Sequence, residues 1–96
     1  MAIFRPMAIF TVVATGDIAK LAAAIRQEFP EDHLAVSPDV WLIAAGGIAK
    51  DVSDRLGITE GQNGTGIVFA MSGYYGFASN AIWEWLTLKL KGAGAA

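Results

Sequence analysis

The chain has 96 residues, of which 54% are hydrophobic and 17% are charged, and its formal net charge is −2. This length predicts a single domain, and no apolar run reaches the roughly 18 to 20 residues that cross a bilayer, so we expect no membrane partner. The dispersed basic residues form no local nucleic-acid-binding patch, and the lack of cysteine excludes disulfides and thiolate chemistry and favours a cytoplasmic location.

A short repeat marks the N-terminus. The tetrapeptide MAIF at residues 1–4 recurs at residues 7–10. Either Met7 is the true start and residues 1–6 are an appendage, which we favour, or the repeat is a short genuine duplication. We therefore expect one domain over residues 7–91 and a flexible tail over residues 92–96.

The first strand and the first helix are predicted in residues 7–29. Residues 7–14 (MAIFTVVA) are apolar at nearly every position, which is typical of a strand buried on both faces. Asp17 is a good N-cap for a helix over residues 18–29, where large apolar side chains recur at helical spacing. Pro30 ends that helix.

A hairpin and a second helix are predicted next. Residues 33–36 and residues 40–45 (VWLIAA) predict two strands, joined by the turn sequence Ser-Pro-Asp at residues 37–39. The next helix is expected over residues 48–56, with apolar side chains at i, i+4 and i+8. Gly57 stands where a C-terminal cap is expected.

The last elements are a strand and a helix. Residues 67–71 predict a fourth strand, which could continue through Tyr74 and Tyr75. A helix from residue 81 to about residue 90 would be capped by its preceding Ser-Asn pair. Residues 86–91 (LTLKLK) also alternate as a strand does, so both readings stay open.

The order β-α-β-β-α-β with an additional C-terminal helix predicts an α+β, ferredoxin-like split βαβ sandwich. Its first and third strands would be central, and both intervening helices would cover one face of the sheet. The third strand, residues 40–45, is apolar on both faces, with Trp41 and Ile43 on one side and the alternate residues on the other.

A bare apolar sheet face has to be covered. At about 25 cal/mol per Å², leaving several hundred Å² wet would forfeit on the order of 10 kcal/mol. The hydrophobic composition therefore predicts self-association, as a homodimer or a higher homo-oligomer. The monomeric alternative is that the last helix folds back over the sheet.

Three parts of the chain together suggest a family. They are the apolar first strand, the VWLI strand followed by a polar turn and helix, and a final strand with a glycine-aromatic stretch and a Trp-x-Trp-Leu helix. In these parts the chain resembles the SinR-like family, small relatives of the second CRISPR-associated protein and of VapD-type toxins. The resemblance covers roughly residues 7–91. It implies a ferredoxin-like homodimer and, in some members, divalent-metal-dependent cleavage of RNA or DNA.

The resemblance implies a metal-binding aspartate at the end of the first strand, commonly directly after a tyrosine. Here that strand ends Ala-Thr-Gly before Asp17, with no Tyr-Asp pair. Asp17 is nevertheless the candidate catalytic residue and metal ligand, acting with its symmetry mate on Mg²⁺ or Mn²⁺. The competing interpretation of Asp17 is plain helix capping.

Other candidate sites carry weaker signals. The Glu-Asp-His segment at residues 31–33 gathers two carboxylates and the single histidine, but consecutive residues rarely converge on one ion, so a solvated loop is favoured. The glycine-rich residues 61–66 run from a helix into a strand, opposite to a phosphate-binding loop. The pair at residues 46–47 is a weak anion-site signal.

Residues 72–85 (SGYYGFASNAIWEW) hold half of the chain's aromatic side chains. A base-stacking platform would need a basic groove, yet no basic residue lies between Arg55 and Lys89. We interpret the stretch chiefly as the closure of a core that two chains share, with Tyr74 and Tyr75 left available to a partner. The predicted interface residues are Trp41, Ile43, Tyr74, Tyr75, Phe77, Trp83 and Trp85.

These features favour a non-catalytic or catalytically degenerate homodimeric interaction module that requires no cofactor. One alternative is a metal-dependent nuclease that uses Asp17 from both subunits, although the charge distribution does not support nucleic-acid binding. The other is a small-ligand sensor with its ligand at the subunit boundary.

Overall fold

The structure is a computed structural model that describes residues 7–73, 76 and 80–92, with side chains through residue 90. Four strands and three helices alternate along these residues in the predicted β-α-β-β-α-β-α order. They are β1 (Ala8–Ala14), α1 (Ile18–Glu28), β2 (His33–Ser37), β3 (Val40–Ala45), α2 (Ala49–Leu56), β4 (Gly66–Ala70) and α3 (Asn80–Gly92).

The strands form one antiparallel sheet in the order β2-β3-β1-β4. The two central strands are β1 and β3, as their uniformly apolar sequences predict. In the register of the sheet, Val12 of β1 lies opposite Trp41 of β3 on one side and Val68 of β4 on the other.

The start of α1 and the end of α2 are set by the capping residues that the sequence predicts. The Asp17 carboxylate accepts a hydrogen bond from the Lys20 backbone N–H, with an N···O distance of 3.1 Å, and so caps α1. Gly57 ends α2 in the left-handed conformation, with φ of 73°. A side chain at Gly57 would be strained and would also meet the Asn63 side chain.

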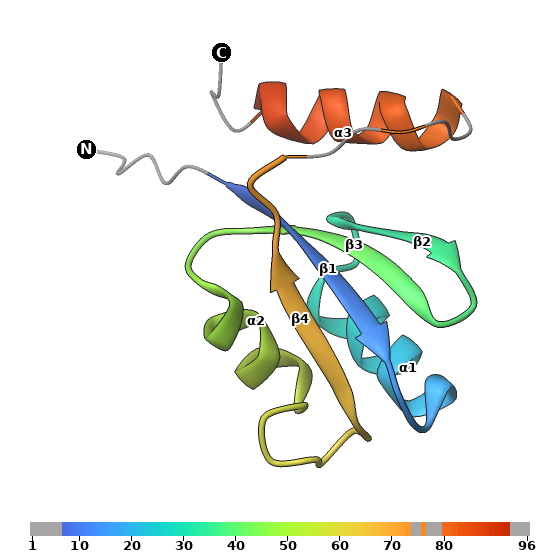
Figure 1. The fold of residues 1–96 in the computed structure, drawn as a ribbon. Coiled ribbons are helices and arrows are strands. Elements are labelled where there is room, and N and C mark those ends of the chain that lie inside the picture. The colour runs from blue at the N-terminus through green and yellow to red at the C-terminus, as the bar shows by residue number, and fades with distance from the viewer. Residues whose placement is uncertain (1–6, 74–75, 77–79, 93–96) are drawn as a thin grey trace.

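Helices α1 and α2 cover one face of the sheet (Figure 1). Between them and the strands lies the larger core, in which the side chains of Phe10, Leu21, Ile25, Ile43 and Leu56 are almost completely buried. This layer arises because right-handed crossovers place both connecting helices on one side of the sheet.

Helix α3 lies on the opposite face, across the end of the sheet where β1 begins and β4 ends (Figure 1). Its Leu86 is 3% exposed and packs against Ile9, Leu42 and Ala44 in a second apolar cluster. The last helix therefore folds back over the sheet, the arrangement that the sequence allowed as the monomeric alternative.

Two sequence-based expectations about the C-terminal part meet the structure differently. Residues 86–91 belong to α3, so the strand reading of this segment is wrong. Strand β4 ends at Ala70, and the predicted continuation through Tyr74 and Tyr75 lies outside the described residues. Within the described part of the chain, no helix is long and apolar enough to cross a membrane.

Candidate interaction surface

In the part of the chain that the structure describes, helix α3 leaves some of its sheet face uncovered. Leu42 faces α3, so by strand alternation Val40 points to the same side, as do its neighbours in the register, Val13 on β1 and Ile67 on β4. Five residues form this uncovered area, which we call the open patch: Thr11, Val13, Val40, Ile67 and Phe69.

The open patch is apolar and accessible. Ile67 is 49% exposed and Phe69 is 50% exposed, while Thr11, Val13 and Val40 are half-buried. No charged side chain belongs to the patch, and the sequence from Gly61 to Trp83 carries no charge. A group of exposed β-branched and aromatic side chains on a sheet is typical of an interaction surface.

The predicted interface residues are distributed differently from this patch. Trp41 is 5% exposed and Ile43 is fully buried, both beneath α1 and α2. They leave no surface for a second chain, because the odd-numbered side chains of β3 point to the helix layer. Trp83 and Trp85 are half-buried in α3 against the sheet. The remaining three, Tyr74, Tyr75 and Phe77, lie outside the described residues.

Asp17, the candidate catalytic and metal-binding residue, is exposed beside β1, and its carboxylate binds the N-terminus of α1. The geometry therefore gives it the capping role. No group of three or more His, Asp or Glu side chains gathers around a possible metal position in the described part of the chain. A metal role for Asp17 stays a prediction that would depend on a second subunit.

The Glu-Asp-His segment is tied to its surroundings rather than arranged around a ligand. The His33 Nδ1 atom lies 2.6 Å from the Phe29 carbonyl oxygen, so it carries the proton that it donates. The Lys89 ammonium of α3 lies 2.6 Å from the Glu31 carbonyl oxygen and 2.8 Å from an Asp32 carboxylate oxygen. These contacts fix α3 to the connection between α1 and β2.

A cleft of about 430 Å³ opens beside that segment, between the end of α1, α2 and α3. Arg55 borders it and donates to the Glu28 carbonyl oxygen at 2.8 Å, with its guanidinium 4.3 Å from the centre of the Phe29 ring. Lys89 is held by Asp32. Both cations of the cleft are thus paired with groups of the chain itself, which leaves their charges poorly placed to attract a ligand.

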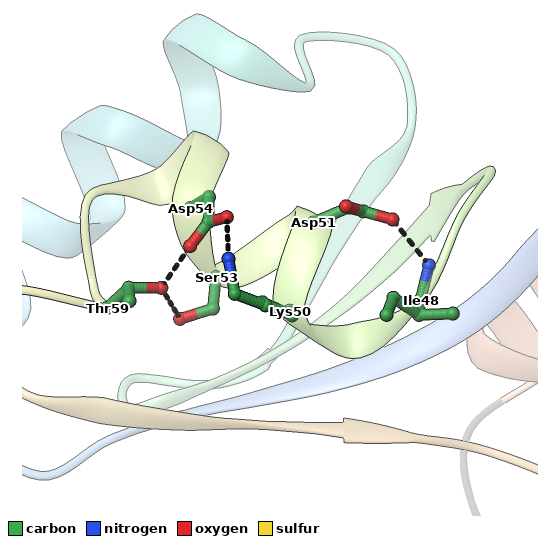
Figure 2. A network of polar contacts seen from close by, with 6 residues as sticks. All are labelled: Ile48, Lys50, Asp51, Ser53, Asp54 and Thr59. Atoms are coloured by element: carbon green, nitrogen blue, oxygen red, sulfur yellow. Dashed lines mark hydrogen bonds and ion pairs between the residues drawn. The ribbon is translucent and has the colours of Figure 1, made fainter.

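The paired glycines at residues 46–47 lead into α2, where the chain supplies its own anion. The Asp51 carboxylate accepts from the Ile48 backbone N–H at 2.9 Å (Figure 2). This carboxylate occupies the helix N-terminus that a bound phosphate would use. The structure thus gives the weak anion signal a capping explanation.

Figure 2 also shows a polar network that closes α2 at its other end. The Asp54 carboxylate lies 2.8 Å from the Lys50 ammonium and 2.5 Å from the Thr59 hydroxyl oxygen. Since the Thr59 proton is used on Asp54, the Ser53 hydroxyl, 2.8 Å away, can donate to Thr59. The hydrogen bond from Lys50, and then that from Thr59, lowers the pKa of Asp54 below its ordinary value.

The glycine-rich loop at residues 61–66 is hydrogen-bonded to neighbouring elements. The Asn63 side chain donates to the Leu56 carbonyl oxygen at 2.8 Å, and the Thr65 hydroxyl lies 3.0 Å from that of Thr15. The loop thus joins α2 to β4 by contacts within the chain, as expected for a connecting segment.

Comparison with known proteins identified no relative. No family model matches the chain, and searches of curated proteins and of solved structures returned no match. Function is therefore inferred from the geometry of the chain itself.

Proposed function

We propose that the chain is a non-catalytic, ferredoxin-like module that works by associating with a second copy of itself through the open patch. The observation that carries this proposal is the incomplete cover of one sheet face. Helix α3 packs over Ile9 and Leu42, whereas Ile67 and Phe69 remain half exposed. The resemblance to SinR-like proteins, which implies a homodimer, agrees with this proposal. We also propose a cytoplasmic location, which the lack of cysteine favours.

The free energy gained by burying the exposed side chains of the open patch favours association. Half of an aromatic or large aliphatic side chain corresponds to about 100 Å², which at about 25 cal/mol per Å² is about 2.5 kcal/mol for Phe69 or Ile67 in each subunit. Two subunits would contribute this surface twice, since a two-fold interface uses the same patch on both. Part of that gain offsets the entropy lost on association.

The nuclease alternative has weaker support. It would require Asp17 to bind Mg²⁺ or Mn²⁺ while its carboxylate caps α1. The ligand-sensor alternative places its ligand at the subunit boundary, and it draws no support from the cleft beside α1, where Arg55 and Lys89 are already paired within the chain. Neither alternative explains why β4 presents two large apolar side chains to solvent.

Light scattering of the purified protein between about 5 and 200 µM tests the proposal. We expect a dimer that dissociates on dilution, and we expect Phe69→Lys to shift the protein to monomer. The matched control is Leu88→Lys, since Leu88 is 64% exposed on α3 but does not belong to the open patch. This control should remain dimeric.

Two results would reject the proposal. One is a wild-type protein that stays monomeric over the whole concentration range. The other is equal loss of dimer in the Phe69→Lys and Leu88→Lys variants, which would show a general solubility effect. Cleavage of RNA or DNA with Mg²⁺ or Mn²⁺ that Asp17→Ala abolishes would instead favour the nuclease.

A further inference from the structure

We propose that two copies of the chain pair along β4, antiparallel and about a two-fold axis at Val68, so that their sheets become continuous. This inference rests on the proposed function, because it specifies how the open patch of one subunit meets that of the other. It is supported by the hydrogen-bonding direction of β4, by its register and by the contrast with β2 at the other edge.

Among the described residues, the backbone of β4 has one side paired with β1 and no strand on its other side. The Met71 N–H donates to the Ile9 carbonyl oxygen at 3.0 Å, and the Thr65 carbonyl oxygen accepts from the Thr15 N–H at 2.9 Å. Backbone groups alternate in direction along an antiparallel strand. The N–H and C=O groups of residues 65, 67, 69 and 71 therefore point toward β1. The N–H and C=O groups of Gly66, Val68 and Ala70 therefore point away from the sheet, along its outer edge.

These outward groups are self-complementary. With the axis at Val68, each Val68 exchanges two hydrogen bonds with Val68 of the partner subunit, and Gly66 exchanges two with the partner's Ala70. The same register places Ile67 opposite Phe69 of the partner subunit in a non-hydrogen-bonded pair, where side chains are closest. The two exposed apolar residues of β4 thus meet one another across the axis.

The opposite edge of the sheet is built to avoid such pairing. Strand β2 has an irregularity between Ala35 and Ser37, and Pro38 comes directly after it. Charged residues Asp32 and Asp39 flank it. Bulges, proline and charge are the devices by which edge strands are protected from other chains. Strand β4, with sequence GIVFA, has none of them and pairs regularly with β1 over its whole length.

Cysteine cross-linking tests the register directly, because the chain has no cysteine of its own. Chains carrying Ile67→Cys and chains carrying Phe69→Cys are purified, mixed in equal amounts and oxidised. The mixture should form a disulfide-linked dimer, since directly opposite Cβ atoms lie about 4.5 to 5.5 Å apart. Each variant alone should give at least about five-fold less, because its cysteines are diagonal neighbours about 7 to 8 Å apart.

The outcomes separate this inference from the proposed function. If light scattering shows dimers of these variants but the mixture does not cross-link, or if either variant alone cross-links as well as the mixture, the β4 pairing is overturned and self-association stands. If the wild-type protein is monomeric, both fail.

A second variant covers the case in which either cysteine substitution weakens the dimer. The Ala70 N–H points away from β1, so Ala70→Pro removes an edge donor without removing a bond between β1 and β4. We expect it to weaken dimerisation about ten-fold or more while the folded monomer persists in circular dichroism. Unchanged dimerisation of a folded Ala70→Pro protein would also overturn the β4 pairing.

Discussion

The two faces of the sheet are both apolar, but they are covered to different extents. On the face beneath α1 and α2, every large side chain of the central strands is buried, including Phe10, Trp41 and Ile43. On the face beneath α3, Leu42 is buried whereas Phe69 is half exposed. Two helices fill one layer, and a single helix across one end cannot fill the other. The first face thus forms most of the core, and the second leaves the apolar surface on which the proposed assembly depends.

The largest expected effect is a loss of stability, and it compares the two sheet faces at neighbouring positions of β3. Ile43, on the α1 and α2 side, is fully buried, so we expect Ile43→Ala to cost about 3 to 5 kcal/mol. Leu42→Ala, beneath α3, should cost about 2 to 3 kcal/mol because α3 can settle into the space. Urea denaturation measures both, and a larger loss for Leu42→Ala would reverse our ranking of the two layers.

The next effect concerns α3 alone. Leu86 is 3% exposed against the sheet and Leu88 is 64% exposed on the outer side. Leu86→Ala should lower the free energy of unfolding by about 2 to 3 kcal/mol, and Leu88→Ala by less than about 0.5 kcal/mol. Equal effects in thermal melts would show that α3 does not pack on the sheet through Leu86.

A smaller effect concerns the ion pair that fixes α3. Lys89 is 20% exposed and bonds Asp32 and the Glu31 carbonyl oxygen, which lie far away in the sequence. We expect Lys89→Ala to cost about 1 kcal/mol, reduced by solvent screening at Asp32. The exposed Lys50 of α2, which bonds Asp54 one turn away, is the control, and Lys50→Ala should lower the melting temperature less than Lys89→Ala does. A Lys89 variant as stable as wild type would show that this polar anchor does not hold α3.

The smallest effect is a pH dependence of the free energy of unfolding, which comes from Asp54 of α2. The folded-state pKa of Asp54 is lowered, so its contribution to stability is present above the ordinary value of 3.8 and is lost as pH falls through the folded-state pKa. Acid titration of stability should therefore be slightly flatter below pH 4 for Asp54→Asn than for wild type. A steeper acid loss in the variant would contradict the sign.

The sequence predicts the elements well because their signals are local. Asp17 caps α1, Gly57 ends α2, and the hairpin turn lies at residues 37–39, each through contacts within a few residues. The central position of β1 and β3 is also predictable, since only strands buried on both faces are apolar throughout.

The sequence does not predict which face of the sheet each β3 side chain occupies. Every position of β3 is apolar, so alternation separates Trp41 from Leu42 but does not say which of them faces α1 and α2. The interface predicted from the sequence therefore includes Trp41 and Ile43, which lie in the core. The exposure of Ile67 and Phe69 depends on how far α3 reaches, which no local pattern records.

The most direct test of the β4 interface is amide hydrogen exchange along this strand at several protein concentrations. The amides of Ile67 and Phe69 face β1 and should be protected at every concentration. Those of Val68 and Ala70 point outward and should become protected only as the concentration rises into the dimer range. Rapid exchange at Val68 and Ala70 in a sample that light scattering shows to be dimeric would contradict the β4 interface.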